Sequence, residues 1–180
     1  MLTGPSGVGK TTVANGLLAV EKNVARVVTY TTREKREGEV DGRDYHFVSR
    51  EEFERKIAQG EMLEWAGVYG HLYGQTVRDV ENILDEGRDV LLVLDPQGVK
   101  TIRQSGREAT AIFLDAPDQE ILSRLIRRDT DTEDVIERRQ RDLAFDRTHA
   151  AFCTHVVQNT EGQLVKTIEA IRKIMYTVRT

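Results

Sequence analysis

The sequence predicts a three-layer α/β fold with a mostly parallel central sheet and a small inserted α+β subdomain. Three observations predict it. Short apolar runs alternate with stretches of helical periodicity, as in chains that build a parallel sheet. Residues 90–94 are an unbroken apolar run, typical of a strand buried on both faces. Residues 38–73 interrupt the alternation with short strand-like pieces such as residues 45–48, which indicates an insertion.

The strands of the central sheet are expected in four short segments with little polar content. They lie at residues 25–29, 90–94, 109–114 and 155–158. Only Met1, Leu2 and Thr3 precede the first glycine-rich loop, where a buried strand is expected. That first strand is therefore either very short or continues before this sequence begins, and the residues leave both options open.

The helices are expected between these strands and after the insertion. They lie at residues 10–20, 51–59, 77–86, 118–128, 132–150 and 163–176. Ser49 followed by Glu52 predicts a capping box for the second helix, and Gly60 predicts its end. Thr76 and Gly87 flank the third helix in the same way.

Composition excludes several classes of protein. The 180 residues fit one domain, and 39% hydrophobic with 31% charged residues is typical of a globular protein. No apolar run approaches the roughly 20 residues of a membrane helix, and no signal-peptide core follows Met1, so we expect a cytoplasmic protein without a membrane partner. The single cysteine excludes an internal disulfide and a cysteine-cluster metal site.

The charge balance argues against a general nucleic-acid binder, because a net charge of -4 gives no broad positive field. The 26 basic residues, however, comprise 19 arginines and only 7 lysines. Arginine binds phosphate through paired hydrogen bonds and stays charged. The excess of arginine fits either codon usage or local phosphate recognition within an acidic protein, and composition leaves both open.

A first phosphate site is predicted where residues 4–11 fit the pattern G-x-x-x-x-G-K-[ST]. The glycines let backbone N–H groups turn towards a phosphate chain, and the following helix directs its positive end there. Lys10 would add charge at the β and γ phosphates, and Thr11 would offer a hydroxyl to Mg²⁺. The expected ATP contacts in this region are Gly4, Pro5, Ser6, Gly7, Val8, Gly9, Lys10, Thr11 and Thr12.

Arg33 and Arg36 follow a strand and lead to Tyr45, a pattern that fits either an anion clamp or, as is commoner in loops, a solvated charged segment. This stretch closely resembles the nucleotide-binding segment of guanylate kinases, and the resemblance covers essentially the whole chain. It rests on Thr-Thr-Arg-x-x-Arg-x-Gly-Glu-Val-Asp-Gly-x-Asp-Tyr-x-Phe-Val from residue 31, on Leu-Glu-Trp-Ala at 63–66, on Leu-Tyr-Gly at 72–74 and on Asp-x-Gln-Gly at 95–98.

The resemblance implies a P-loop kinase fold and the transfer of a phosphoryl group from ATP to GMP with Mg²⁺. It divides the chain into a core at about 1–32, 76–127 and 140–180, a GMP-binding subdomain at about 33–75, and a helical lid at about 128–139. The partners would be nucleotides, and the protein would be a monomer or a homodimer. The segment from Arg128 to Asp134, with Arg139 after it, is similar to the family's lid.

The resemblance also implies individual roles. Arg33, Arg36, Tyr45 and Tyr73 would hold the GMP phosphate. Glu64 would accept hydrogen bonds from N1–H and the 2-amino group of guanine, because a carboxylate is an acceptor only. Thr29 would donate to O6, Asp95 would belong to the GMP site, and Asn159 would contact adenine. Catalytic roles at the transferred phosphoryl group would fall to Lys10, Arg33, Arg124, Arg128 and Arg139.

Two positions depart from the family pattern. Gln75 stands where a serine or threonine usually reaches guanine O6; its amide can still donate, and Thr76 is an alternative donor. Val93 stands where the first aspartate of Asp-x-Asp is common. Because of these changes, the sequence leaves open whether the enzyme prefers GMP or dGMP. It also leaves open that the chain is a related kinase whose substrate is a ribose bisphosphate. A non-catalytic guanylate-kinase-like module that binds proteins is a third alternative, although such modules typically lose the P-loop that this chain keeps.

Overall fold

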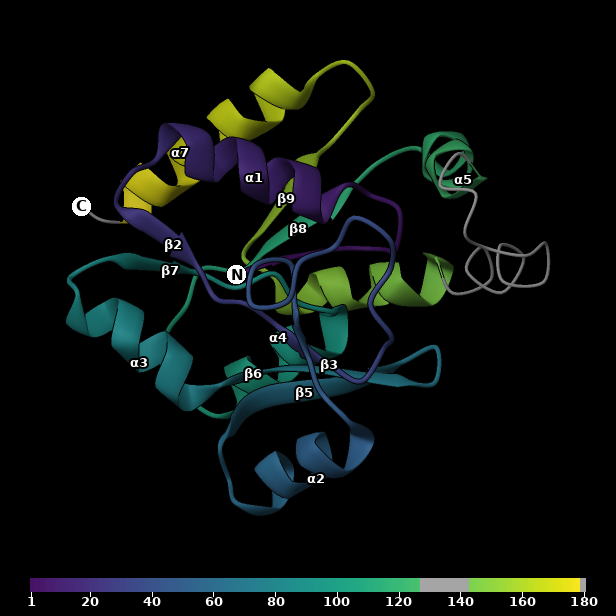
Figure 1. The fold of residues 1–180 in the computed structure, drawn as a ribbon. Coiled ribbons are helices and arrows are strands. Elements are labelled where there is room, and N and C mark those ends of the chain that lie inside the picture. Colours follow the sequence, from purple (N-terminus) through teal and green to yellow (C-terminus); the bar gives the residue numbers. More distant parts are fainter. Residues whose placement is uncertain (127–142, 179–180) are drawn as a thin grey trace. The chain divides into compact units, whose positions relative to one another are not determined.

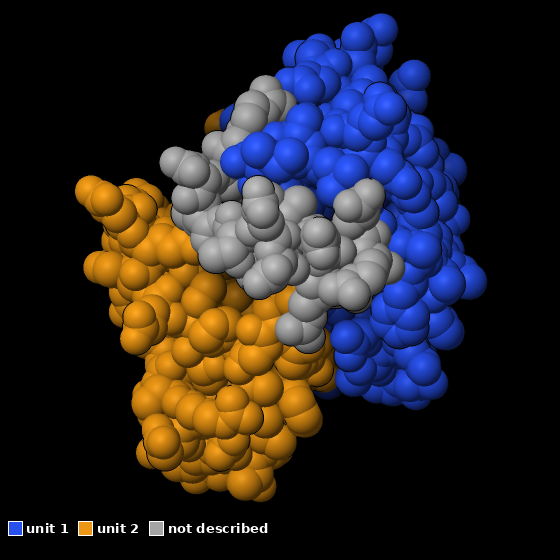
Figure 2. Space-filling view, turned by 90° about the vertical axis from the view of Figure 1, so that its right-hand side faces the viewer, with its two compact units in different colours: residues 1–21, 93–180 blue, residues 22–92 orange. Residues whose placement is uncertain are grey.

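The computed structural model describes residues 1–126 and 143–178. Two compact units make up the chain: unit 1 comprises Met1–Glu21 and Val93–Thr180, and unit 2 comprises Lys22–Leu92 (Figure 2). The subdomain limits of 33 and 75 stay a prediction. The lid expected at 128–139 lies outside the described residues.

The sheet of unit 1 is parallel, as the sequence predicts. Strands β1 (Leu2–Thr3), β8 (Ile112–Asp115) and β9 (His155–Gln158) lie in the order β1-β8-β9, and Val93 forms a further parallel bridge with Leu2. Ile112, Phe113 and Leu114 are all buried, which is the pattern of a strand covered on both faces. Of the expected strands, 155–158 is observed with those limits, whereas 109–114 begins three residues later.

Helices cover both faces of this sheet and make the three-layer arrangement (Figure 1). Helices α1 (Lys10–Val20) and α7 (Leu164–Val178) pack together on one face, and α4 (Pro96–Gln104) and the 3-10 helix η1 (His149–Phe152) contact each other on the other. Helix α5 (Asp118–Ile126) follows β8. The helix expected at 132–150 falls mostly outside the described residues, although residues 143–148 are helical.

Helix α4 is absent from the sequence-based expectations, although its start carries a recognisable signal. The Asp95 side chain accepts a hydrogen bond from the Gln97 backbone N–H at 2.9 Å, and Pro96 occupies the first helical position. Proline is favoured there because its missing N–H would have no partner within the helix. The Asp-Pro pair therefore begins a helix immediately after the apolar run at 90–94.

Unit 2 combines a parallel strand pair with a mixed sheet. Strands β2 (Val24–Arg26) and β7 (Asp89–Leu91) are parallel, and both are shorter than the expected 25–29 and 90–94. The second sheet has the order β4-β3-β6-β5. Its strands are β3 (Tyr30–Thr31), β4 (His46–Phe47), β5 (Met62–Val68) and β6 (His71–Thr76). β5 and β6 form an antiparallel hairpin, and β3 is parallel to β4 but antiparallel to β6.

The helices of unit 2 begin at capping residues that the sequence predicts. Ser49 caps α2 (Arg50–Ala58) by accepting from the Glu52 N–H, and Thr76 caps α3 (Val77–Asp85) by accepting from the Asp79 N–H. Phe53 of α2 is fully buried and anchors the helix. No helix among the described residues is both long and apolar enough to span a membrane.

Candidate functional site

The loop between β1 and α1 has a backbone that glycine alone adopts readily. Gly7 and Gly9 have φ values of 83° and 97°, in the left-handed region. A Cβ at Gly9 would lie 2.6 Å from Asn159 Nδ2, and a Cβ at Gly7 would lie 2.8 Å from the Leu125 side chain. Gly9 is the N-cap of α1 and no side chain caps this helix, so its first N–H groups can bind an anion.

The polar side chains of the loop lie at the start of α1. Lys10 Nζ donates to the carbonyls of Gly4 at 2.6 Å and Pro5 at 3.0 Å, which places the ammonium against its own loop. Thr11 and Thr12 are exposed in the first helical turn. Nowhere in the described part of the chain do three His, Cys, Asp or Glu side chains gather as a metal site. A lone hydroxyl suits Mg²⁺, which usually keeps waters and relies on substrate phosphates.

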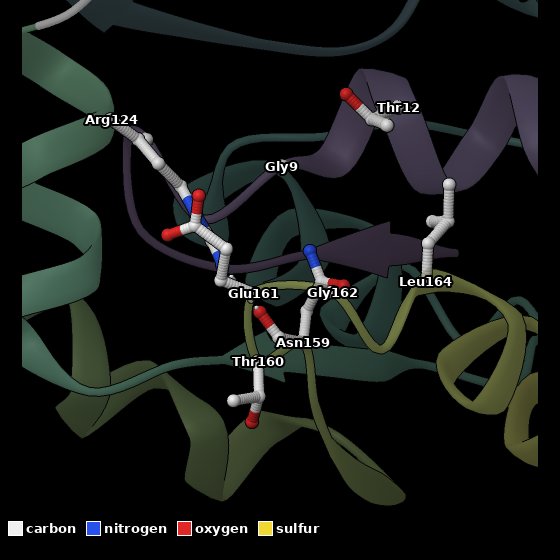
Figure 3. A pocket seen from close by; sticks show the side chains of 9 residues that line it. Gly9, Thr12, Arg124, Asn159, Thr160, Glu161, Gly162 and Leu164 are labelled. Carbon is white, nitrogen blue, oxygen red and sulfur yellow. Dashed lines mark hydrogen bonds between the residues drawn. The ribbon is translucent and has the colours of Figure 1, made fainter.

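The Val8 carbonyl is hydrogen-bonded by two residues from outside the loop, Asn159 and Arg124, which were expected to contact adenine and the transferred phosphoryl group. It accepts from Asn159 Nδ2 at 2.7 Å and from Arg124 at 3.1 Å. Arg124 also donates to the Asn159 carbonyl at 2.9 Å and pairs with Glu120 at 2.8 Å. In Figure 3, Arg124 extends from α5 and the nitrogen of Asn159 points towards the loop at Gly9. These two side chains therefore connect α5 and the end of β9 to the phosphate-binding loop.

A cavity of about 290 Å³ lies beside this arrangement (Figure 3). Its walls come from the loop, the start of α1, α5 and the segment after β9. The lining residues are Gly7, Gly9, Thr12, Arg124, Asn159, Thr160, Glu161, Gly162 and Leu164. Asn159, the residue implied to contact adenine, is thus at the cavity wall, although its side-chain amide is bonded to the loop.

Unit 2 brings together three of the four residues expected at the GMP phosphate. The Arg33 guanidinium lies 5.4 Å from the centroid of the Tyr45 ring and 5.7 Å from that of Phe47. The rings of Tyr45 and Tyr73 meet edge to face at 6.1 Å. Burial raises the pKa of Tyr45 above its ordinary value, and the neighbouring Tyr73 adds to the effect. Arg33, Tyr45 and Tyr73 therefore form one cluster.

Glu39 connects this cluster to Arg36, the fourth residue. Its carboxylate accepts from Arg33 at 2.7 and 2.9 Å and from the Arg36 backbone N–H at 2.8 Å. Desolvation would raise the pKa of Glu39, but hydrogen bonds from Arg33 and Arg36 outweigh it and lower that pKa. Burial likewise opposes the charge of Arg33, and bonding to Glu39 raises the pKa of Arg33.

The residues expected to read guanine are also close together. Glu64 lies opposite Gln75 in the β5–β6 pair, so both side chains project from the same face. Glu64 is 4% exposed and Gln75 is fully buried. Gln75 Nε2 donates to Thr29 Oγ1 at 3.1 Å. Gln75 therefore contacts Thr29, the other residue expected to donate to O6.

Other expected site residues have structural partners. Thr76 caps α3 and bonds to Asp79, so it is engaged in starting the helix. Asp95 caps α4 and belongs to unit 1, whereas the other expected GMP contacts belong to unit 2. Arg128 and Arg139 lie outside the described residues, and their lid roles stay predictions.

Two polar residues next to the expected site residues, one in each unit, received no role from the sequence. Glu39 lies within the segment Gly-Glu-Val-Asp-Gly, and its signal was a carboxylate six residues after Arg33 in the same loop. Thr167 is 2% exposed on the face of α7 that also buries Ile168 and Ile171. Its only signal was a hydroxyl on the apolar face of a helix.

Comparisons with known proteins agree with the motifs. The guanylate kinase family model matches residues 1–177. A guanylate kinase of Enterococcus faecalis is 42% identical over 177 residues, covering 97% of this chain and 86% of that protein. One of Symbiobacterium thermophilum is 44% identical over 140 residues, covering 77% of this chain and 66% of that protein. The crystal structure of guanylate kinase from Anaplasma phagocytophilum matches with a TM-score of 0.77 at 33% identity, covering 98% of this chain and 82% of that one.

Proposed function

The chain belongs to the guanylate kinase family and is an ATP-dependent kinase of GMP, and we propose how its residues divide that reaction. Unit 1 binds ATP through the loop at residues 4–12, and unit 2 supplies the GMP contacts except Asp95. The observation that carries this division is the separation of two anion sites: a glycine loop with Lys10 in one unit, and the Arg33 cluster in the other.

Lys10 supplies positive charge at the phosphoryl group that moves. The Nζ group already lies against the Gly4 and Pro5 carbonyls, so it is positioned before the substrate arrives. The uncapped N–H groups of α1 would hold phosphate oxygens, and the Thr11 hydroxyl would be a ligand of Mg²⁺. When bound, Mg²⁺ neutralises negative charge on the phosphates. Phosphoryl transfer requires this kind of positioning and charge rather than a covalent nucleophile.

Arg33, Arg36, Tyr45 and Tyr73 bind the GMP phosphate in this proposal. Glu39 holds Arg33 through two hydrogen bonds, so the guanidinium keeps one orientation at the ring of Tyr45. A guanidinium fixed in this way loses less conformational freedom when phosphate binds.

Guanine is read by Glu64 and Thr29, with Gln75 acting through Thr29. The Gln75 amide donates to the Thr29 oxygen, which leaves the Thr29 hydroxyl proton directed elsewhere. Thr29 is thereby set as a donor, as guanine O6 requires. Adenine has no 2-amino group and an acceptor at N1, so it would leave the Glu64 carboxylate without those donors, and such sites can discriminate by about 10⁴-fold.

The roles of the other arginines and of Asp95 come from the family resemblance or from contacts with the phosphate-binding loop. Arg128 and Arg139 act at the transferred phosphoryl group, and Asp95 assists at the GMP site. Arg124 supports the loop through the Val8 carbonyl. The partners are small nucleotides rather than nucleic acid, with the protein as monomer or homodimer.

Substitution of Lys10 tests the ATP side. Lys10→Ala should lower kcat by about a hundredfold or more, because a charge at the transferring group acts mainly in the transition state. The measurement is a coupled assay of ADP release with ATP and GMP. Lys166→Ala is the matched control, since Lys166 is exposed on α7.

The same assay separates the alternatives. GMP or dGMP should support turnover, and a ribose bisphosphate should not. A kcat for Lys10→Ala equal to that of the control variant would contradict the assignment of the loop. Turnover with a ribose bisphosphate and none with GMP would select the related kinase instead.

A further inference from the structure

Thr167 contacts the side chain that holds the phosphate-binding loop. Its hydroxyl lies 3.2 Å from Asn159 Oδ1, 3.1 Å from the Gln158 carbonyl and 3.3 Å from the Gln163 carbonyl. All three are acceptors, so the single proton of the hydroxyl is shared among them. Thr167 comes from α7, and both it and Asn159 are buried, at 2% and 7% exposure.

The orientation of the Asn159 amide follows from its two neighbours. A carbonyl can only accept, so the amide must present Nδ2 to the Val8 carbonyl, 2.7 Å away. Its Oδ1 then faces the Thr167 hydroxyl. An amide turned by 180° would place an oxygen against the Val8 oxygen. The orientation in which Asn159 holds the loop is thus the one whose Oδ1 can accept the Thr167 proton.

The Val8 carbonyl in turn sets the direction of a backbone donor. Because a peptide group is planar and trans, the carbonyl of Val8 and the N–H of Gly9 point in opposite directions. With its carbonyl bonded to Asn159 and Arg124, this peptide directs the Gly9 N–H to the other side of the loop. Backbone N–H groups of such a loop are what bind phosphate oxygens.

We propose that Thr167 is a positioning residue for the phosphate-binding loop, acting through Asn159 on the Val8–Gly9 peptide. The proposal rests on residues 4–11 being the ATP loop of the proposed function. Neither Thr167 nor its hydroxyl needs to touch the nucleotide. Loss of the hydroxyl should weaken ATP binding and leave GMP binding unchanged, because neither Thr167 nor Asn159 is among the proposed contacts of GMP.

Thr167→Val tests the proposal, since valine keeps the shape and removes the donor. We expect KM for ATP to rise about five- to tenfold, as for the loss of one buried hydrogen bond, with KM for GMP within about twofold of wild type. Thr167→Ser should restore KM for ATP. Thr101→Val is the control for loss of a helical hydroxyl, because the Thr101 hydroxyl donates to the carbonyl four residues earlier, as that of Thr167 does to Gln163, and Thr101 is exposed.

A double-mutant cycle distinguishes positioning from a general loss of packing. In an Asn159→Ala background, Thr167→Val should no longer change KM for ATP, because the residue through which it acts is gone. Additive effects, or a Thr167→Val enzyme indistinguishable from Thr101→Val, would overturn the proposal. These two outcomes would overturn only the role of Thr167. The proposed function would still stand as long as the wild-type enzyme turns over GMP.

Hydrogen exchange of the unsubstituted protein gives an independent test that requires no variant to fold. The Asn159 Nδ2 protons, followed by ¹⁵N NMR without nucleotide, should exchange much more slowly than those of an exposed side chain such as Asn82. Exchange of Asn159 as fast as that of Asn82 would contradict a fixed amide and overturn the proposal.

Discussion

Arg33 keeps its charge in a partly buried position because Glu39 accompanies it. The side chains of the two residues are 12% and 21% exposed, and their ion pair is 2.7 Å long. The resemblance to guanylate kinases predicts a phosphate-binding role for the two arginines in this loop, and that role stays a prediction. The carboxylate that orients one of them could not be predicted, because a charged loop residue is more often solvated than paired.

The depressed pKa of Glu39 predicts a pH dependence of stability. A carboxyl whose pKa is lower in the folded state stabilises the protein above its unfolded pKa of about 4.3, and this stabilisation is lost as the pH falls through the folded value. Wild type should therefore exceed Glu39→Gln in free energy of unfolding at pH 7, and the difference should shrink as the pH falls below about 4. Urea unfolding across this pH range measures it.

Glu37→Gln is the control for that prediction. Glu37 is exposed in the same loop, so its substitution removes a charge without removing the ion pair with Arg33. A difference between wild type and Glu39→Gln that stays constant with pH would contradict the expectation.

Helix starts are the elements that the sequence predicted best. Ser49 and Thr76 both accept from the backbone N–H three residues on, as the local pattern indicates. A second acidic side chain, Glu51, also contacts this cap. The Glu51 carboxylate accepts a hydrogen bond from the Glu51 backbone N–H and another from the Ser49 side chain, and together these bonds lower the pKa of Glu51. Capping depends on neighbours within one turn, which is why it can be predicted locally.

The cap of α2 predicts a measurable loss of stability. Ser49→Ala should reduce the free energy of unfolding by about 1 kcal/mol, because the Glu52 N–H loses its acceptor. Ser49→Asp should retain it, since aspartate is an equally good cap. Urea unfolding of the three proteins is the measurement, and an unchanged midpoint for Ser49→Ala would count against the cap.

At the scale of the whole molecule, the proposed function assigns the two units different halves of the reaction. The glycine loop and Lys10 belong to unit 1, whereas Arg33, Tyr45 and Glu64 belong to unit 2. Binding of either nucleotide should therefore stabilise the folded protein on its own, because each substrate has its own contacts.

Thermal unfolding tests this expectation directly. A ligand at about 100 times its Kd adds about 2.7 kcal/mol of stability, so Mg-ATP alone and GMP alone should each raise Tm. AMP in place of GMP should leave Tm nearly unchanged, and Lys10→Ala should reduce the shift with Mg-ATP. Absence of any shift with Mg-ATP would favour a non-catalytic binding module.

The sequence by itself determined the reaction class, the glycine loop, most helices and the parallel sheet of unit 1, because these depend on local backbone preferences and on motifs of adjacent residues. Helix α4 was missed, although Asp95 and Pro96 marked its start. Only the tertiary structure decided that Gln75 contacts Thr29, 46 positions away, and that Asn159 holds Val8, 151 positions away. Such hydrogen bonds depend on how distant segments pack, which no local pattern encodes.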